Sequence, residues 1–181
     1  MRFVPTELPG VVVIEPDVLG DARGFFVESW SRAKFRAGGI DVEFVQDNHS
    51  RSAKDVVRGL HMQVDPPQHK LVRVTRGAIV DFVVDVRVGS PRFGRFVQLE
   101  LSAANFRQVF VPAGYAHGLV ALEDDTEVQY KVSAPWNRDG EVTIEWNDPE
   151  LALPWPVAQP VLSAKDRAGL PVRAVQARLG P

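Results

Sequence analysis

Four cationic or titratable side chains lie close together in the segment VVRGLHMQVDPPQHKLVRVTRG, which covers residues 56–77. They are Arg58, His61, His69 and Lys70. Imidazole titrates near neutral pH, and guanidinium and ammonium groups bind anions. A metal site, an acid–base site that handles an anion, or a solvated strand edge could each contain such a cluster. Other motifs of the chain must decide between these three interpretations.

A second histidine motif, VPAGYAHG, places His117 after a Pro-x-Gly turn and resembles the second motif of the cupin jelly rolls. Metal-binding cupins supply a His-x-His pair and a Glu from their first motif, for which GLHMQVDPPQHK is the candidate. His61 takes the first ligand position, Gln63 replaces the second His, and His69 with Lys70 replaces the acid. Because an ammonium group would repel a divalent cation, we expect this site to hold no metal.

Short runs rich in β-branched and aromatic residues must position these side chains, and each run is bounded by Gly, Pro, Asn or Asp. The runs are GVVVIEP, VEFVQDN, HKLVRVTRG, AIVDFVVDVRVG, RFVQLELS, RQVFVPAG, HGLVALED, TEVQYKVSA and EVTIEWND. Their spacing of about ten residues is typical of antiparallel sandwiches and barrels. We expect an all-β fold, a double-sheet jelly-roll barrel with an interior cavity, as one domain over residues 1–181.

Helical signals are few. SRAKFRAGG could form a short helix that Ser31 caps and Gly38 ends, and SAKDRAG near the C-terminus could form one more turn. The proline-rich stretch PELALPWPVAQPVLS cannot be a central strand. We therefore expect it to run across the barrel as an ordered arm that carries Trp155.

Two carboxylates, Asp81 and Asp85, lie in a run that looks buried. Burying a carboxylate is costly unless it is paired, so each needs a partner, for which Lys70 and His117 are the candidates. We expect both aspartates to support the site from behind it.

Composition limits the function classes. The chain has 181 residues, a net charge of −2 and no cysteine. The charge argues against a protein that binds nucleic acid through bulk positive charge, although a local basic pocket for a phosphorylated small molecule fits. The absence of cysteine fits a reducing compartment. The N-terminal residues lack the apolar core of a signal peptide, and no apolar run reaches the length of a membrane span, so we expect a cytoplasmic protein with no membrane contact.

Eight motifs in order resemble those of one enzyme family. They are DARGFFVES, FVQDNHS, VVRGLHMQ, KLVRVTRGAIVDFVVDVRVGSPRFG, VPAGYAHG, QYKVS, IEWNDPEL and PVLSAKD. Together they resemble the dTDP-4-dehydrorhamnose 3,5-epimerase family over residues 2–173. The resemblance implies a homodimeric jelly roll that needs no cofactor. It also implies inversion of C3 and C5 of a dTDP-linked 4-keto-6-deoxyhexose.

The resemblance assigns four catalytic residues. His61 matches the base, and Asp166 matches the acid that pairs with it. Tyr130 matches the proton donor that acts from the opposite face of the sugar. Lys70 matches a residue near the C4 oxygen, where a cation would stabilise the enolate.

The same resemblance assigns substrate contacts. They are Arg23, Glu28, Gln46, Asn48, Arg58, Lys70, His117, Glu141 and Lys165. The segment with Arg23 lies near the dimer interface in the family and helps to complete the partner's site. One position departs from the family, because Trp136 stands where a tyrosine usually stacks on the thymine ring. Tryptophan can also stack on a base, so the departure concerns nucleotide specificity more than chemistry.

Three other functions compete with this interpretation. A 3-epimerase of the same family would invert C3 alone with the same base and acid. A 3,4-ketoisomerase is also a cupin, but its usual histidine pattern is absent here. A cupin that only binds sugar nucleotides would have a broken base–acid set, whereas His61, Asp166 and Tyr130 are all present.

Overall fold

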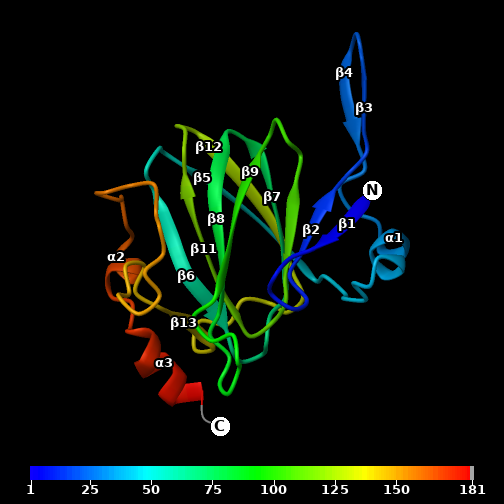
Figure 1. Cartoon of the computed structure of the whole chain (residues 1–181). Coiled ribbons are helices and arrows are strands. Elements are labelled where there is room, and N and C mark those ends of the chain that lie inside the picture. Colours follow the sequence, from blue (N-terminus) through cyan, green and yellow to red (C-terminus); the bar gives the residue numbers. More distant parts are fainter. Residues whose placement is uncertain (180–181) are drawn as a thin grey trace.

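Two antiparallel sheets form the body of the molecule in the computed structural model, which describes residues 1–179. The six-stranded sheet contains, in spatial order, β1 (Arg2–Pro5), β2 (Val12–Glu15), β10 (Gln108–Val111), β7 (Lys70–Arg76), β12 (Thr126–Val132) and β5 (Gln46–Ser52). The five-stranded sheet contains β13 (Glu141–Thr143), β6 (Val57–Gln63), β11 (Tyr115–Ala121), β8 (Ala78–Asp85) and β9 (Phe96–Ser102). The sheets face each other as in a jelly roll (Figure 1).

The inward faces of both sheets form the barrel interior. Alternate residues point inward along each strand. One end of the interior is apolar, with Val72 and Val109 from one sheet packed near Ile79, Val83 and others from the second sheet. The other end is polar and contains the cluster that the sequence singles out. The apolar end therefore holds the two sheets together beneath a polar cavity.

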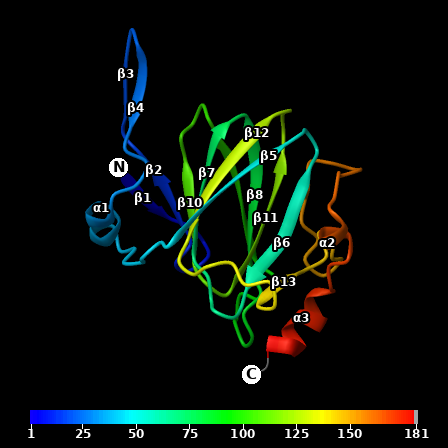
Figure 2. The same ribbon diagram turned by 180° about the vertical axis from the view of Figure 1, so that it is seen from behind.

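The C-terminal arm covers the outer face of the five-stranded sheet, as both views show (Figures 1 and 2). Phe82 and Val84 of β8 point outward and pack under this arm, where the Trp155 ring lies 4.5 Å from the Phe82 ring. Two helices complete the arm, α2 (Ala164–Arg167) and α3 (Val172–Leu179). The expected ordered arm is confirmed. Because β8 is buried on both faces, all its residues are buried.

The N-terminal part of the chain forms two different structures beside the six-stranded sheet. Helix α1 (Arg32–Ala37) buries Phe35 against the outer face of that sheet, together with Ile14 and Phe110. Strands β3 (Val18–Asp21) and β4 (Gly24–Val27) form a hairpin that projects away from the body (Figures 1 and 2).

Each run that the sequence analysis expected to be a strand contains one, and both expected short helices are present. The run VEFVQDN is placed too early, because the strand begins only at Gln46. The expected cap at Ser31 makes no side-chain hydrogen bond to α1. Strands β1, β3, β4 and β6 and helix α3 were not expected. Among residues 1–179, no helix is long and apolar enough to cross a membrane.

Candidate active site

A cavity of about 440 Å³ opens at the polar end of the barrel, a size typical of small-molecule sites. Both sheets and the C-terminal arm line it. The lining residues that the sequence analysis assigned are Asn48, Arg58, His61, Lys70, His117, Tyr130, Trp136, Glu141, Lys165 and Asp166. The structure therefore brings ten of the predicted site residues to one cavity, although they span more than a hundred positions of the chain.

His61 and His117 lie side by side on the wall that the five-stranded sheet provides. They are directly opposite each other in the pairing of β6 with β11. Each imidazole has an aspartate on its far side, Asp166 from α2 for His61 and Asp81 from β8 for His117. The wall therefore carries a row of two histidines between two carboxylates.

The His61–Asp166 pair has the geometry of a general base with its orienting acid. His61 Nε2 lies 2.5 Å from Asp166 Oδ1. The other oxygen of Asp166 accepts a 2.6 Å hydrogen bond from the Ser163 hydroxyl, and Oδ1 also accepts from the Gly59 amide at 3.3 Å. With Nε2–H donated to the carboxylate, Nδ1 is the basic nitrogen of His61.

The charge states of this pair follow from its surroundings. Burial raises the pKa of Asp166, but hydrogen bonds from His61 and Ser163 outweigh it and lower the pKa to about 2. Burial lowers the pKa of His61, and nearby Lys165 and Lys70 lower it further, against the opposing effect of Asp166. Because neutral donors also hold Asp166, the carboxylate stays charged while the imidazole is neutral. His61 is thus able to accept a proton at neutral pH.

The local backbone makes this approach possible. Gly59 has a φ of +124°, and a Cβ there would lie 2.7 Å from the Gly118 Cα. No side chain fits at that distance, so β6 and β11 come together only at glycine. Ser163 caps α2 by accepting from the Asp166 amide at 3.1 Å. The capped turn holds the Asp166 carboxylate against β6.

Lys70 and Tyr130 face the histidines from the six-stranded sheet. Burial lowers the pKa of Lys70 to about 8, so its amine is mostly charged at neutral pH. Burial raises the pKa of Tyr130, so its phenol stays protonated. A base on one wall and a proton donor on the opposite wall can reach opposite faces of one bound ring.

The second pair, His117 and Asp81, lies deeper. His117 Nε2 is 2.7 Å from Asp81 Oδ2, and the Asp81 side chain is fully buried. The expected partner of Asp81 is therefore confirmed as His117. For Asp85 the expectation was wrong, because Arg87 and Ser90 bind its carboxylate at 2.6 and 2.7 Å. The chain turns back directly after β8, which brings Arg87 within reach and leaves Asp85 outside the cavity.

A chain of contacts joins the cavity rim to α2. The Trp136 indole N–H donates to Glu141 at 3.3 Å, and the other oxygen of Glu141 accepts from Lys165 at 2.9 Å. Gln46 accepts from the Trp136 amide at 3.2 Å and donates to Asn48 at 2.8 Å. Trp136 is 57% exposed, so its indole ring is accessible at the rim.

Three predicted substrate contacts do not line this cavity. Gln46 lies beside the rim, bonded to Asn48, whereas the other two are farther away. Arg23 is at the tip of the β3–β4 hairpin, where it binds Asp21 and is 90% exposed. Glu28 pairs with Lys34 of α1 at 2.8 Å. Within one chain, neither residue reaches the histidines.

His69, the fourth residue of the initial cluster, has a structural position. Its ring stacks on Phe110, and its Nδ1 accepts from the Ala113 amide at 3.2 Å. In the described part of the chain, no three His, Cys, Asp or Glu side chains form a group that could hold a metal ion.

Ser163 and Gly59 are parts of the site that were not expected from the sequence. Ser163 stands three residues before Asp166, a spacing typical of an N-cap serine that binds the third residue of a helix. That spacing could have identified Ser163. Gly59 gives no such signal, because only the crossing of β6 and β11 makes a side chain impossible there.

Comparison with known proteins adds independent evidence. A profile described as dTDP-4-dehydrorhamnose 3,5-epimerase matches residues 5–173. The chain is similar to the dTDP-4-dehydrorhamnose 3,5-epimerase of Pseudomonas aeruginosa, with 50% identity over 171 residues, or 93% of this chain and 94% of that protein.

Solved structures agree with the sequence comparison. The crystal structure of dTDP-6-deoxy-D-glucose-3,5-epimerase RmlC from Legionella pneumophila, in complex with dTDP-4-keto-L-rhamnose, aligns with a TM-score of 0.95 at 41% identity. The alignment covers 99% of this chain and 97% of that one. ChmJ, a 3'-monoepimerase from Streptomyces bikiniensis, aligns with a TM-score of 0.90 at 31% identity, covering 98% and 90% of the two chains.

Proposed function

This chain belongs to the dTDP-4-dehydrorhamnose 3,5-epimerase family, and we propose that His61 and Tyr130 carry out the reaction of that family in the barrel cavity. The enzyme inverts C3 and C5 of dTDP-4-dehydro-6-deoxy-D-glucose and gives dTDP-4-dehydro-L-rhamnose. The observation that carries this proposal is the placement of the His61–Asp166 pair and Tyr130 on opposite walls of one cavity.

The C4 ketone of such a substrate explains why these groups suffice. It acidifies the hydrogens on both neighbouring carbons, so a base can remove either proton and leave an enolate. In our proposal His61 Nδ1 takes the proton and Asp166 stabilises the imidazolium that forms. Tyr130 then returns a proton to the opposite face, which inverts the carbon. His61 then loses its proton to solvent and Tyr130 regains one from solvent, and the same steps at the second carbon complete the reaction.

Lys70 is placed to stabilise the enolate. Its amine is largely charged at neutral pH and lines the same cavity as His61 and Tyr130. A donor of this kind lowers a barrier by about 3–4 kcal/mol, by analogy with an oxyanion hole. Each step moves only protons, and the charge on the enolate is met by an ammonium group. We therefore propose that the reaction needs no cofactor and no metal.

The rim provides groups for the nucleotide. Arg58 donates to Ser52 and to the Arg51 carbonyl, which holds its guanidinium at the mouth of the cavity, where it can bind the diphosphate. The exposed ring of Trp136 can stack on thymine, a contact worth ~1–3 kcal/mol. Gln46 and Asn48 complete the polar rim beside it.

We propose that the protein works as a homodimer in which each hairpin serves the partner's cavity. Leu19, Phe25 and Phe26 on the hairpin are each more than 60% exposed, which is costly for an isolated chain. Arg23 and Glu28 have no route to their own cavity. A second copy would cover the apolar hairpin and bring Arg23 to a diphosphate.

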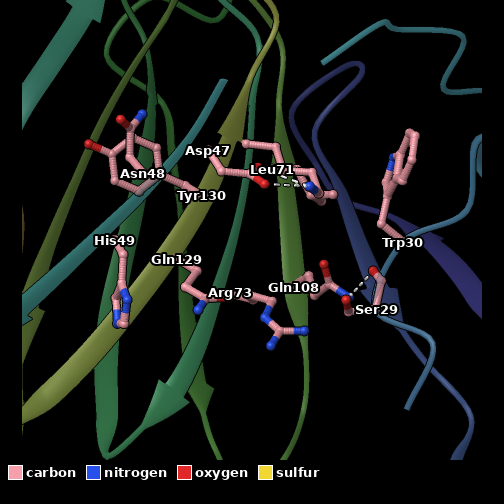
Figure 3. Close-up of a pocket in the computed structure, with 11 residues that line it drawn as sticks. Ser29, Trp30, Asp47, Asn48, His49, Leu71, Arg73, Gln108, Gln129 and Tyr130 are labelled. Carbon is pink, nitrogen blue, oxygen red and sulfur yellow. Dashed lines mark hydrogen bonds and ion pairs between the residues drawn. The ribbon is translucent and has the colours of Figure 1, made fainter. Parts of the chain in front are cut away.

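The outer face of the six-stranded sheet also favours a second copy. Figure 3 shows Gln129, Arg73 and Gln108 in a row across a shallow groove that ends at Trp30. The groove has a volume of about 240 Å³. Arg73 Nε and Trp30 Nε1 are buried without a hydrogen-bond partner in the described residues. Partner groups at a dimer interface would satisfy both donors.

Proton exchange in heavy water tests the function directly. The protein is incubated with dTDP-4-keto-6-deoxyglucose, and C3 and C5 are followed by NMR. We expect deuterium at both carbons and an L-sugar product. Deuterium at C3 alone would indicate the 3-epimerase, and no deuterium with tight binding would indicate a protein that only binds. Turnover should be unchanged by a chelator, and a loss restored by zinc or iron would contradict the metal-free proposal.

Subunit mixing tests the dimer. Arg23→Ala and His61→Ala proteins, each nearly inactive, are unfolded together and refolded. In a mixed dimer one cavity has an intact His61 and receives an intact Arg23 from its partner. Random pairing should restore about a quarter of the wild-type sites. No recovery, or a monomer by sedimentation, would contradict the proposal.

We also propose that the protein is located in the cytoplasm. The chain contains no cysteine, which fits a reducing compartment.

A further inference from the structure

Asp81 is a fully buried carboxylate beneath the cavity, and the proposed reaction does not use it. It lies on β8, where its neighbours on the same face, Ile79 and Val83, pack in the apolar barrel core. Its side chain has no exposed surface, and its Oδ1 has no hydrogen-bond partner in the described residues. A buried carboxylate in this state is costly unless nearby positive charge offsets it.

Two groups can offset this cost, His117 with a hydrogen bond and Lys70 with a positive charge. His117 is bonded to Asp81 Oδ2 at 2.7 Å and lines the same cavity as Lys70. The charge of Asp81 raises the pKa of the Lys70 amine. By contrast, Asp85 points inward from the same strand but has Arg87 and Ser90 as direct partners. The charge of Asp85 is therefore satisfied locally, whereas the charge of Asp81 reaches into the cavity.

We propose that Asp81 is a positioning residue of the active site. One carboxylate oxygen fixes the His117 ring, and the negative charge of the group keeps the Lys70 amine charged inside the cavity. The inference rests on the proposed function, because it takes Lys70 as the group that stabilises the enolate and His117 as a contact of the same substrate.

The first effect concerns the tautomer of His117. A charged carboxylate only accepts, so it holds the proton of a neutral imidazole on Nε2. Nδ1 of His117 is then an acceptor on the cavity side. It can accept a hydrogen bond from a sugar hydroxyl but cannot donate to phosphate. Asp81 therefore makes His117 specific for a hydroxyl group of the hexose.

The second effect concerns Lys70. Its pKa reflects burial first, which lowers it, and then the charges around it, among which Glu141 and Asp81 raise it and Lys165 lowers it. The charged and titratable groups that face it are Arg58 and His61 on β6, Asp81 on β8, His117 on β11, Tyr130 on β12, Glu141 on β13, and Lys165 and Asp166 on α2. Glu141 raises the pKa of Lys70 more than Asp81 does, but Glu141 is also bound to Lys165, whose charge lowers that pKa. Asp81 adds a second negative charge from beneath the cavity.

Asp81→Asn removes the charge and keeps the shape, and Asp85→Asn is the matched control on the same strand. In the Asp81 variant, the titration of Lys70, followed by the ¹³Cε resonance of labelled lysine, should move to lower pH by less than about one unit. The alkaline limb of the kcat profile should move with it. The ¹⁵N shifts of His117 should show loss of the Nε2–H tautomer. In Asp85→Asn the Lys70 titration, the alkaline limb of kcat and the His117 ¹⁵N shifts should all match those of the wild type.

A fall in kcat that is equal at every pH, with Lys70 and His117 unchanged, would overturn the proposal and leave Asp81 a structural residue. The Lys70 titration does not depend on turnover. If the wild type failed to epimerise the sugar but Asp81→Asn still moved that titration, the proposed function would fail and the role of Asp81 toward Lys70 would stand.

A measurement on the wild-type protein covers the case in which Asp81→Asn does not fold. The ¹³Cγ resonance of Asp81 should change with the same midpoint as the Lys70 ¹³Cε resonance, near the pKa of about 8. A flat Asp81 resonance through that range would overturn the proposal.

Discussion

The two histidine–aspartate pairs of this enzyme have neighbouring positions but different surroundings. His61 and His117 face each other across β6 and β11, and each bonds an aspartate through Nε2. Asp166 comes from a separate helix and also accepts hydrogen bonds from Ser163 and Gly59. Asp81 comes from the adjacent strand of the same sheet, and its second oxygen is unpartnered in the described residues.

In our proposal, this difference separates the His61–Asp166 pair, whose imidazole changes its charge during the reaction, from the His117–Asp81 pair, which holds its charge constant. The donors around Asp166 fix that carboxylate whether His61 is neutral or protonated, so the imidazole can gain and lose a proton while its position stays the same. Asp81 lacks such donors, so its charge acts on His117 and Lys70 instead. The first pair, His61 with Asp166, therefore suits proton transfer. The second pair, His117 with Asp81, suits orientation and electrostatic stabilisation.

The largest expected effect comes from removing the base. His61→Ala should lower kcat by about 10⁴-fold, the upper end of what a general base contributes, while binding of dTDP survives. Turnover in heavy water and dTDP affinity by calorimetry measure the two quantities. A near-normal rate would refute the assignment of His61 and remove the contrast between the pairs.

Removing the charge of Asp166 should have the next largest effect. Asp166→Asn should lower kcat by about 10³-fold, because an amide does not hold Nε2–H in place and does not stabilise the imidazolium. The variant should bind dTDP normally. A kcat equal to that of wild type would show that Asp166, like Asp81, only positions its histidine.

Asp166→Asn should also lower the free energy of unfolding, by an amount that depends on pH. The pKa of Asp166 is lowered from 3.8 to about 2, so its contribution is present above about pH 4 and is lost as the pH falls through 2. This contribution amounts to about 2 kcal/mol. The unfolding free energies of wild type and Asp166→Asn should differ at pH 6 and converge near pH 2.

Tyr130→Phe tests the group that faces both pairs. The variant should lower kcat by about 10²-fold, because only reprotonation is impaired. Exchange of substrate hydrogen for deuterium by His61 should persist without inversion. Full-rate inversion in this variant would mean that another group donates the proton.

His117→Ala should affect binding more than chemistry, in contrast to His61→Ala. Loss of one buried hydrogen bond to the sugar should raise KM by about tenfold, with kcat changed less. The split between KM and kcat is the measurement. A loss of kcat as large as in His61→Ala would show that both pairs transfer protons.

The sequence predicted much of this arrangement. The correct predictions and the missed elements have different physical reasons. Alternating apolar runs indicated the strands that carry Lys70 and Tyr130, because one face of each is buried. The β3–β4 hairpin has no buried face, so no hydrophobic pattern marks it. Strand β6 was missed because Gly59 interrupts its pattern. The resemblance to a family joined His61 to Asp166, since no local spacing links residues 105 positions apart.

The partners of the two buried aspartates, Asp81 and Asp85, could be predicted only in part from the sequence. A buried run predicted that Asp81 and Asp85 need cations, but the choice of cation depends on where the chain turns after β8. That turn gives Arg87 to Asp85, while the pairing of β8 with β11 gives His117 to Asp81. Such pairings follow from strand register, which depends on turns and on packing between strands and could not be read from this sequence alone.

The smallest expected effect concerns a charge near the first pair. Lys165 lowers the pKa of His61, so Lys165→Met should raise it and move the acidic limb of kcat to higher pH by less than about one unit. The imidazole is active when neutral, so activity at low pH should fall while activity above neutrality is kept. Lys165→Arg retains the charge and should leave the limb in place. A limb that does not move in Lys165→Met would mean that it belongs to the second pair, and that His117 rather than His61 is the group that titrates.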